Sequence, residues 1–535
     1  MAIDEQDVGP ATGPEAGERS PAEHRHRRLA VGSVLVVLAL CGVLRSITAD
    51  AHLPWQHHWD EATNVTVGQR MSDDLSIDPG FYDYPALVFV TQAAVLVPAT
   101  LIGGYDPDDD GPVLDTQVLG TSRVEHPALL RAMRWTTGVL PQLVTTAVAA
   151  AIAWVVTRRW YAAAGAAVLV TLSAVDLRYG TFVTPDALSG MAATLAVLGA
   201  VMITRAPTTR RYLWTGAAIG LAASAKYNAA AVVIALVVAH VLAHRRPLAE
   251  RRPLLIAAAA AAAVFAVVNL GGTVHPLDFL GEIGSEGAHY RNGHFGSEGN
   301  SPAFNATWLW WSFGLALPLA ACSLLSRASD VRRAAIVLLS FAVGYYVFLS
   351  AFPVRFARNL LPISGTIAAA AAIGLVVCMQ RLVEAGSRRT AGWAATGVLV
   401  VAVLALPVTG AAGALRSVDE DPWGEVNTWL AENAPAGSTV AIEAFSPYID
   451  EARFNVLVGG SPLIGTTGGG LRWFEDRGVD YYVASDEMFQ PFLDHPEEDP
   501  GAALIYLRLL SDECRVHEAE GAGHRLVVAK APCDP

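Results

Sequence analysis

The sequence predicts a mainly α-helical, polytopic membrane protein that ends in a smaller α/β domain. Of the 535 residues, 53% are hydrophobic and only 16% are charged, whereas a typical soluble protein carries about 25% charged residues. The charge is also unevenly placed: residues 417–535 hold 22 acidic and 7 basic side chains, net −15, which leaves about +2 of the total of −13 for the remainder. No nucleic-acid partner is expected, because the chain has no basic footprint.

The N-terminal segment, residues 1–28, is polar and contains several glycines and prolines. It ends in Arg25, Arg27 and Arg28, directly before an apolar run from Leu29 to Leu44. We expect a disordered cytoplasmic tail followed by a retained membrane helix, since no small-residue cleavage site precedes His52.

Ten further apolar runs follow, and each approaches the length of about 20 residues that a membrane-spanning helix needs. Together with the first run they predict about eleven spans and a membrane domain over residues 29–416. The runs lie at 135–156, 161–177, 187–204, 212–225, 227–243, 254–270, 308–325, 334–351, 360–379 and 391–408.

The apolar run from Pro85 to Gly103 decides the topology. If it does not cross, the arginine-rich loops between later spans all fall in the cytoplasm, as the positive-inside rule requires. We therefore predict a juxtamembrane or re-entrant helix within a catalytic outer loop, residues 48–134. The protein then lies in the cytoplasmic (plasma) membrane with its N-terminus inside and residues 417–535 outside.

The C-terminal region, residues 417–535, alternates short strands with amphipathic helices. Asp421-Pro422 resembles a helix start, with a capping residue followed by proline in the first turn. Strands are predicted at 439–445, 479–484 and 525–530. This region is long enough to form its own core.

Two cysteines of the C-terminal region flank a predicted hairpin that turns near residues 521–523. Antiparallel pairing would bring Cys514 and Cys533 together, and an outer location is oxidising. We expect a structural disulfide between them.

Carboxylates gather in three segments that the topology places at the outer ends of spans. Asp60 and Glu61 follow the first span, Asp83 and Tyr84 lead into the membrane-skimming helix, and Asp186 opens a span. Adjacent acids are often only a solvated loop, but a carboxylate at the mouth of a span is costly unless it is used or paired.

Three cations are predicted at the same level. Lys226 is the only lysine of the membrane part, and Arg355 and Arg358 stand at an outer boundary against the positive-inside trend. Such arginines often extend to lipid headgroups, yet arginine also binds phosphate oxygens in a bidentate fork. Carboxylates and cations at one level suit a lipid-linked phosphate donor and an acceptor hydroxyl.

These segments resemble the GT-C glycosyltransferases of glycosyltransferase family 39, which includes protein O-mannosyltransferases and lipid A aminoarabinose transferases. The resemblance covers the membrane part, and its motifs are Trp-Asp-Glu-Ala-Thr-Asn at 59–64, Phe-Tyr-Asp-Tyr-Pro at 81–85, Thr-Pro-Asp-Ala-Leu at 184–188, Lys-Tyr at 226–227 and Arg-Asn-Leu-Leu-Pro at 358–362.

The resemblance implies a GT-C fold and transfer of a sugar, with inversion, from a polyprenyl-phosphate carrier to an acceptor protein, lipid or polysaccharide outside the membrane. It assigns the acceptor hydroxyl to Asp60, with Glu61 beside it. The resemblance also implies that the carrier phosphate is bound by Lys226, Arg355 and Arg358. Asp83, Tyr84 and Asp186 are implied to support these residues. One departure is Tyr84-Pro85-Ala86, where the aminoarabinose transferases have a lysine before a proline pair.

No cofactor is required by these motifs, although the loop from Gly271 to Ala306 offers candidate ligands for a divalent metal. They are His275, Glu282, Glu286, His289 and His294. Scattered His and Glu in a polar loop are more often solvated than metal-bound.

Two alternatives to the enzyme stay open. A transporter or flippase for a lipid-linked or anionic solute would place ionisable residues near mid-bilayer on broken helices, whereas here they gather at the ends of spans. A non-catalytic protein would use its outer domain to bind a partner or a cell-wall glycan.

Overall fold

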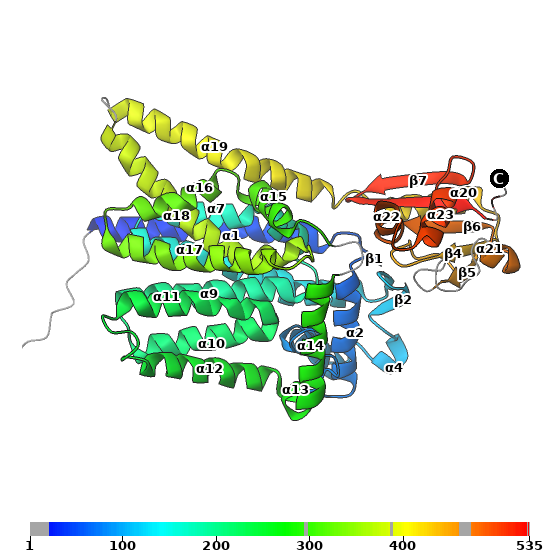
Figure 1. Ribbon diagram of the computed structural model, residues 1–535, viewed down its shortest axis with the longest axis horizontal. Coiled ribbons are helices and arrows are strands. Elements are labelled where there is room, and N and C mark those ends of the chain that lie inside the picture. The colour runs from blue at the N-terminus through cyan, green and yellow to red at the C-terminus, as the bar shows by residue number, and fades with distance from the viewer. Residues whose placement is uncertain (1–20, 294–297, 386–388, 460–471, 532, 534–535) are drawn as a thin grey trace, which may run out of the picture.

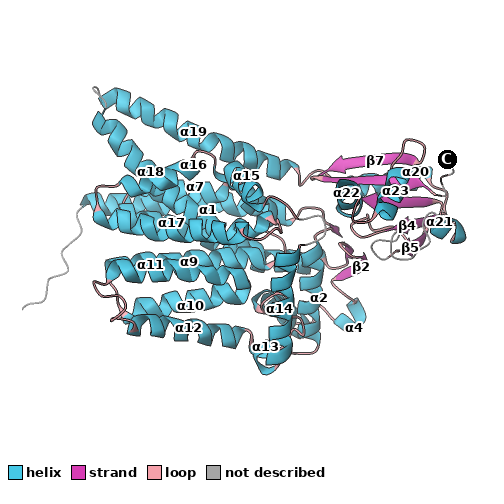
Figure 2. Cartoon of the chain, viewed as in Figure 1, coloured by secondary structure: helices cyan, strands magenta, loops and turns pink. Residues whose placement is uncertain are grey.

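The computed structural model describes residues 21–293, 298–385, 389–459, 472–531 and 533. Within these ranges a bundle of long helices lies next to a layer of strands and short helices at one end (Figures 1 and 2). The first helix begins at Pro21, before the expected boundary at residue 29. Of the tail predicted over residues 1–28, residues 1–20 lie outside the described residues, and residues 21–28 belong to this helix.

The bundle is built from the helices that the apolar runs predict, and Figure 1 shows most of them running roughly parallel to the long axis. Their bounds are α1 Pro21–Ala49, α5 Pro127–Arg134, η1 Trp135–Val139, α6 Leu140–Thr157, α7 Trp160–Thr171, α8 Ala174–Tyr179, α9 Pro185–Arg205, α10 Thr209–Ala225, η2 Tyr227–Val232, α11 Val233–Ala243, α12 Arg252–Val268, α15 Ser301–Phe313, α16 Ala316–Cys322, η3 Ser323–Leu325, α17 Ser329–Ser350, η4 Ala357–Leu360, α18 Leu361–Ala385 and α19 Arg389–Arg416.

Six helical segments in the described part of the chain are long and apolar enough to cross a membrane, and α15 with α16 forms a seventh that is bent by 91°. The expected count of eleven is not reached, because four predicted runs form the shorter helices α7, α10, α11 and α12, each of 17 residues or fewer. The coarser prediction of a polytopic helical membrane domain agrees with the structure.

Several elements lie across one end of this bundle. Figure 1 shows α2 and α14 nearly perpendicular to the long helices, and the run predicted at 85–103 forms α3, whose buried Phe89 and Gln92 face α2. The bounds are α2 Trp59–Asp73, α3 Leu87–Leu101, α4 Pro107–Asp110, α13 Leu270–Val274 and α14 Pro276–Asn292. A small antiparallel sheet of order β1-β3-β2 joins them, with β1 Trp55–Gln56, β2 Leu114–Val118 and β3 Thr121–Val124.

The C-terminal layer contains a five-stranded sheet of order β5-β4-β6-β8-β7. Strands β5, β4 and β6 are parallel, while β8 and β7 are antiparallel to their neighbours. The bounds are α20 Pro422–Asn433, β4 Thr439–Ile442, β5 Asn455–Val458, α21 Arg472–Asp476, β6 Tyr481–Ser485, α22 Asp486–Asp494, α23 Pro500–Leu509, β7 Arg515–Gly521 and β8 His524–Lys530.

Both faces of the five-stranded sheet are buried. Successive residues of a strand point to opposite faces, and accordingly Ala441 packs with Phe489 and Tyr506 of α22 and α23, whereas Val440 packs with Trp423 of α20. Cys514 and Cys533 are joined by the expected disulfide, with 5.5 Å between their Cα atoms.

The turn of the β2–β3 hairpin docks on the C-terminal layer. The Gln117 amide donates to the Ile449 carbonyl oxygen at 2.9 Å and accepts from the Ile449 N–H at 2.8 Å, and the Phe445 N–H donates to the Leu119 carbonyl oxygen at 2.9 Å. The Tyr448 hydroxyl donates to Asp115 at 2.5 Å. These contacts hold the sheet over the end of the bundle.

Candidate active site

A cavity of about 800 Å³ lies between the end of the bundle and the C-terminal layer. It is lined by α2, α8, α14, the segment before α18 and the loops and ends of the C-terminal sheet. Five of the eight residues predicted for catalysis, phosphate binding or support of the site line it, namely Asp60, Asp83, Tyr84, Arg355 and Arg358.

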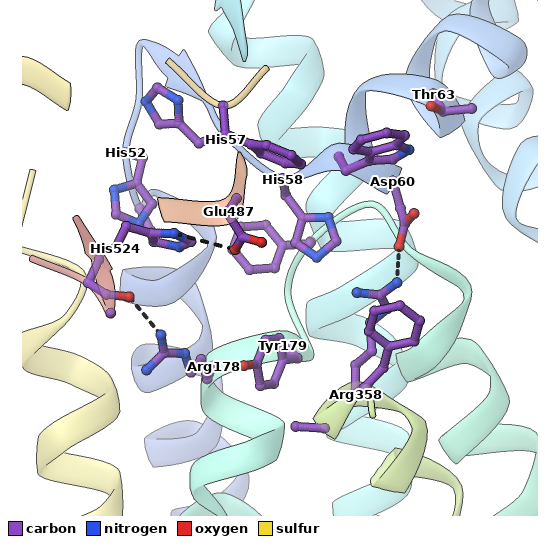
Figure 3. A pocket seen from close by; sticks show the side chains of 18 of the residues that line it. His52, His57, His58, Asp60, Thr63, Arg178, Tyr179, Arg358, Glu487 and His524 are labelled. Atoms are coloured by element: carbon purple, nitrogen blue, oxygen red, sulfur yellow. Dashed lines mark hydrogen bonds and ion pairs between the residues drawn. The ribbon is translucent and has the colours of Figure 1, made fainter. Parts of the chain in front are cut away.

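Asp60 stands in the first turn of α2, where the helix dipole favours a carboxylate. The Arg358 guanidinium lies 2.6 Å from Asp60 Oδ2, and Figure 3 shows the two side chains facing each other. Burial raises the pKa of the Asp60 carboxyl, but the positive charge of Arg358 and a hydrogen bond from Tyr84 outweigh it and leave the pKa lowered. Asp60 is therefore an ionised carboxylate that faces a cavity.

Arg358 belongs to a chain of alternating charges. Its Nε lies 3.8 Å from Asp186 Oδ2, and the Lys226 ammonium lies 2.6 Å from Asp186 Oδ1. Lys226 also donates to Asn359 Oδ1 at 2.5 Å. The order is thus Asp60, Arg358, Asp186, Lys226, and it joins α2, α9 and the start of η4 and α18.

Lys226 and Asp186 are not among the residues that line the cavity, and the role of Lys226 as a phosphate ligand stays a prediction. The ammonium is buried behind the wall, because Asp186 and Asn359 surround it. A buried lysine needs such partners to remain charged. Lys226 holds Asp186, which in turn faces Arg358.

Glu61 does not line the cavity either, and its predicted catalytic role stays a prediction. Its carboxylate accepts two bonds from Arg134, at 2.8 and 2.6 Å, and a third from the Val183 N–H at 2.9 Å. Consecutive side chains on a helix point about 100° apart, which explains why Asp60 faces the cavity while Glu61 faces the protein interior. Glu61 ties α2 to α5 and to the turn before α9.

Arg355 lines the cavity beside Arg358 and lies over the Phe304 ring, 5.8 Å from its centroid. Arg358 lies over the Phe356 ring at 4.4 Å. Aromatic faces stabilise guanidinium groups without neutralising them. Two guanidinium groups therefore line the same cavity as Asp60.

The α14 side of the cavity carries acids. Burial and the neighbouring Asp83 raise the pKa of Glu286 to about 7, and burial together with Glu282 raises the pKa of Asp83. Among the described residues, no three His, Cys, Asp or Glu side chains are grouped so as to hold a metal ion. Of the proposed metal ligands, His294 lies outside the described residues, so a metal site stays a prediction.

The C-terminal layer and α8 supply lining residues that sequence reasoning missed. His524 Nδ1 lies 3.5 Å from Glu487, and Arg178 donates to the Ala522 carbonyl oxygen at 2.6 Å (Figure 3). Phe445 lines the same region and contacts Trp59. Trp59 itself belongs to the Trp-Asp-Glu motif, so the motif could have indicated that it lies at the site. Arg178, Glu487, Ala522 and His524 follow no local pattern and come from segments far apart in the sequence.

Comparisons with known proteins agree with this architecture. Residues 129–270 match the family described as dolichyl-phosphate-mannose-protein mannosyltransferase, a segment that contains Arg134, Asp186 and Lys226. No curated protein sequence matches the chain.

Among solved structures, the archaeal oligosaccharyltransferase AglB from Archaeoglobus fulgidus superposes with a TM-score of 0.50 at 12% identity, over 94% of this chain and 74% of that chain. ArnT from Cupriavidus metallidurans in the apo state gives 0.49 at 13% identity, over 93% and 98% of the two chains. The matched family segment and the fold shared with the oligosaccharyltransferase confirm the predicted resemblance to membrane-embedded GT-C glycosyltransferases.

Proposed function

We propose that this protein transfers a sugar from a polyprenyl-phosphate donor to an acceptor hydroxyl in the cavity, on the extracytoplasmic side of the membrane. The observation that carries the proposal is the Asp60–Arg358 ion pair at the cavity wall, with Arg355 beside it. The matched family acts on dolichyl-phosphate-mannose by its description, and the oligosaccharyltransferase was solved with a dolichol-phosphate.

Arg358 and Arg355 supply the positive charge that the leaving phosphate needs. The bond between the anomeric carbon and the phosphate oxygen breaks, and its electron pair stays on the carrier phosphate. A guanidinium fork stabilises the negative charge that develops there. Asp186 and Lys226 fix Arg358 from behind through the 3.8 and 2.6 Å contacts.

Asp60 acts on the acceptor. Its carboxylate accepts the proton as the acceptor oxygen forms the new bond to the anomeric carbon. The products are the glycosylated acceptor and the free polyprenyl phosphate, and this single displacement inverts the anomeric centre. A lowered pKa keeps Asp60 ionised at neutral pH.

The orientation follows from charge and redox chemistry. Three connections of the bundle, between α6 and α7, between α9 and α10, and between α11 and α12, carry nine arginines when the adjoining helix ends are included. In Figure 1 the connection between α11 and α12 lies at the end of the bundle away from the C-terminal layer. The positive-inside rule assigns that end to the cytoplasm. The Cys514–Cys533 disulfide favours an oxidising location for the cavity end.

The test is sugar transfer by the purified full-length protein in nanodiscs, with radiolabelled polyprenyl-phosphate mannose, glucose and galactose and with peptide, glycan and lipid acceptors. Asp60→Asn should lower transfer by about 10²- to 10⁴-fold, the contribution of a general base. Asp74→Asn, at the exposed C-terminal end of the same helix, is the matched control and should leave transfer unchanged.

Arg358→Gln should weaken binding of undecaprenyl phosphate, whereas Asp60→Asn should not. Equal rates of transfer by Asp60→Asn and the wild type would show that Asp60 is not the general base. Movement of the labelled lipid across the bilayer in both proteins, without any transfer, would favour the transporter.

A further inference from the structure

We infer that the acceptor is a carbohydrate, and that its sugar ring packs on an aromatic platform formed by Trp59 and Phe445 beneath the C-terminal layer. This inference rests on the proposed glycosyl transfer and adds the chemical class of the acceptor. Trp59 and Phe445 lie in a part of the cavity that the donor chemistry does not use.

Trp59 precedes Asp60 in α2, and its side chain is 39% exposed although it lines the cavity. Its ring centroid lies 5.5 Å from that of Phe445, with 33° between the ring planes. An aromatic face exposed in a cavity is a ready binding surface. The C–H bonds on one face of a pyranose or furanose ring pack against such a surface, while the hydroxyl groups remain free at the edge.

The second half of the platform is held in a backbone conformation that phenylalanine rarely adopts. Phe445 has φ +64°, in the left-handed region. Its N–H donates to the Leu119 carbonyl oxygen at 2.9 Å, and its own carbonyl oxygen accepts from the Trp423 indole at 3.0 Å. Non-glycine residues held in this region concentrate at functional sites.

The neighbouring hairpin leaves space for the Phe445 ring. Gly120 of the β2–β3 turn has φ +79°, and a Cβ atom there would lie 2.5 Å from the ring. The position of the ring therefore depends on a glycine 325 positions earlier in the sequence. The docking of hairpin and sheet fixes the platform before any ligand binds.

The polar groups around the platform suit hydroxyls better than phosphate. Glu487 and His524 line the cavity 3.5 Å apart, and both remain partly exposed. Burial and Arg178 lower the pKa of His524 to about 4, so the imidazole is neutral and offers one donor and one acceptor. A carboxylate here repels a phosphate but accepts hydrogen bonds from sugar hydroxyls.

A peptide acceptor fits this region less well. Extended peptides commonly bind by adding a strand to an open sheet edge. Of the described residues that line the cavity, His524 at the start of β8 is the one that belongs to a strand, and β8 is covered on both edges by β6 and β7. The side chains at the cavity, not backbone edges, carry the recognition.

The experiment measures transfer by the full-length protein in nanodiscs to short mannan, arabinan, galactan and glucan oligosaccharides and to serine- and threonine-containing peptides. Trp59→Ala and Phe445→Leu should raise KM for the oligosaccharide used by about tenfold or more, as loss of a central aromatic contact does. The kcat should change much less, since ground-state and transition-state binding are lost equally. Trp59→Phe should restore most of the affinity.

Trp55→Ala is the matched control. Trp55 lies in β1, four positions before Trp59, and its ring centroid lies 5.6 Å from that of Tyr448 in the C-terminal layer, but it does not line the cavity. Binding of undecaprenyl phosphate, measured in parallel, should be equal in all variants.

Transfer by the wild type to peptides alone would overturn the inference and leave the proposed function intact. A Trp59→Ala variant with the same KM as Trp55→Ala would overturn it too. If the wild type binds no undecaprenyl phosphate and transfers to no acceptor, the proposed function fails, and the inference fails with it.

Discussion

Two arginines three positions apart on α5 show how burial decides how much an ion pair contributes to the stability of the fold. Arg134 and Glu61 are 1% and 0% exposed, and they pair at 2.6 Å. Arg131 and Asp50 pair at the same distance, but both are about half exposed. Removal of one partner from a buried pair leaves an uncompensated charge, whereas a solvated partner keeps its water.

We therefore predict that Glu61→Gln destabilises the protein by about 3–5 kcal/mol, while Asp50→Asn changes the free energy of unfolding by at most about 1 kcal/mol. Thermal unfolding of the detergent-purified variants measures both. Equal unfolding temperatures for the two variants would contradict a structural role for Glu61. Glu61→Gln should also retain binding of undecaprenyl phosphate if it still folds, because Glu61 does not line the cavity.

At the residue scale the sequence predicted the cavity well where the motif residues themselves face it. Asp60, Arg355 and Arg358 were identified as candidates, and each lines the cavity. Glu61 and Lys226 do not line the cavity, and their direct roles stay predictions, because a motif shows which residues occur together but not which way each side chain turns. Arg134 escaped notice, since its partner lies 73 positions away.

At the scale of single elements, close packing between helices of the bundle depends on small residues. Gly220 of α10 lies so close to α12 that a Cβ atom would stand 2.4 Å from the Ala261 carbonyl oxygen, which is backbone and cannot rotate away. Gly397 of α19 has no atom within 4 Å of the corresponding position among the described residues. Both glycines lie in apolar helices, so they form a matched pair.

Gly220→Ala should lower stability by about 1–3 kcal/mol through overpacking, whereas Gly397→Ala should be neutral or stabilise the helix by up to about 1 kcal/mol. The measurement is thermal unfolding followed by helical circular dichroism. A Gly220→Ala protein as stable as the wild type would mean that α10 and α12 separate freely. The apolar pattern predicted these helices, but not this close approach, because periodicity contains no information about the neighbouring backbone.

The sheet carries a buried acid at the end of β4. Glu443 accepts hydrogen bonds from Tyr482, from Tyr506 at 2.6 Å and from the Ser485 N–H at 2.9 Å. Burial nevertheless raises its pKa from 4.5 to about 7. Because the folded protein binds this proton more tightly than the unfolded chain does, the Glu443 contribution to stability falls as the pH rises from about 4.5 to about 7.

Glu443→Gln should remove that dependence. Between these pH values the unfolding temperature of the wild type should fall relative to that of Glu443→Gln and then stay constant relative to it above about pH 7. Glu432→Gln, at an exposed position on α20, should follow the wild type throughout. Parallel curves for the wild type and Glu443→Gln would show that the carboxyl titrates normally.

On the scale of the whole molecule, the cavity exists because two regions that fold from distant parts of the chain meet. The sequence predicted both regions, since one is apolar and the other acidic, but it could not place the second over the first. That placement depends on side chains of the β2–β3 hairpin and on residues more than 300 positions later, such as Gln117 with Ile449. No local pattern links two such segments.

Because the hairpin holds the C-terminal layer in place, we predict that weakening this contact impairs binding of the acceptor but not binding of the donor. Gln117→Ala combined with Tyr448→Phe removes the hydrogen bonds to Ile449 and Asp115, so the layer that carries Phe445 and His524 should lose its fixed position over Asp60. We expect KM for the acceptor to rise by about tenfold or more, since small displacements of positioning groups are costly. Binding of undecaprenyl phosphate should not change, because Arg355 and Arg358 belong to the bundle. Tyr481→Phe, in the same sheet but away from the hairpin, should match the wild type in both measurements, and a double variant with wild-type KM would show that the layer is held by other contacts.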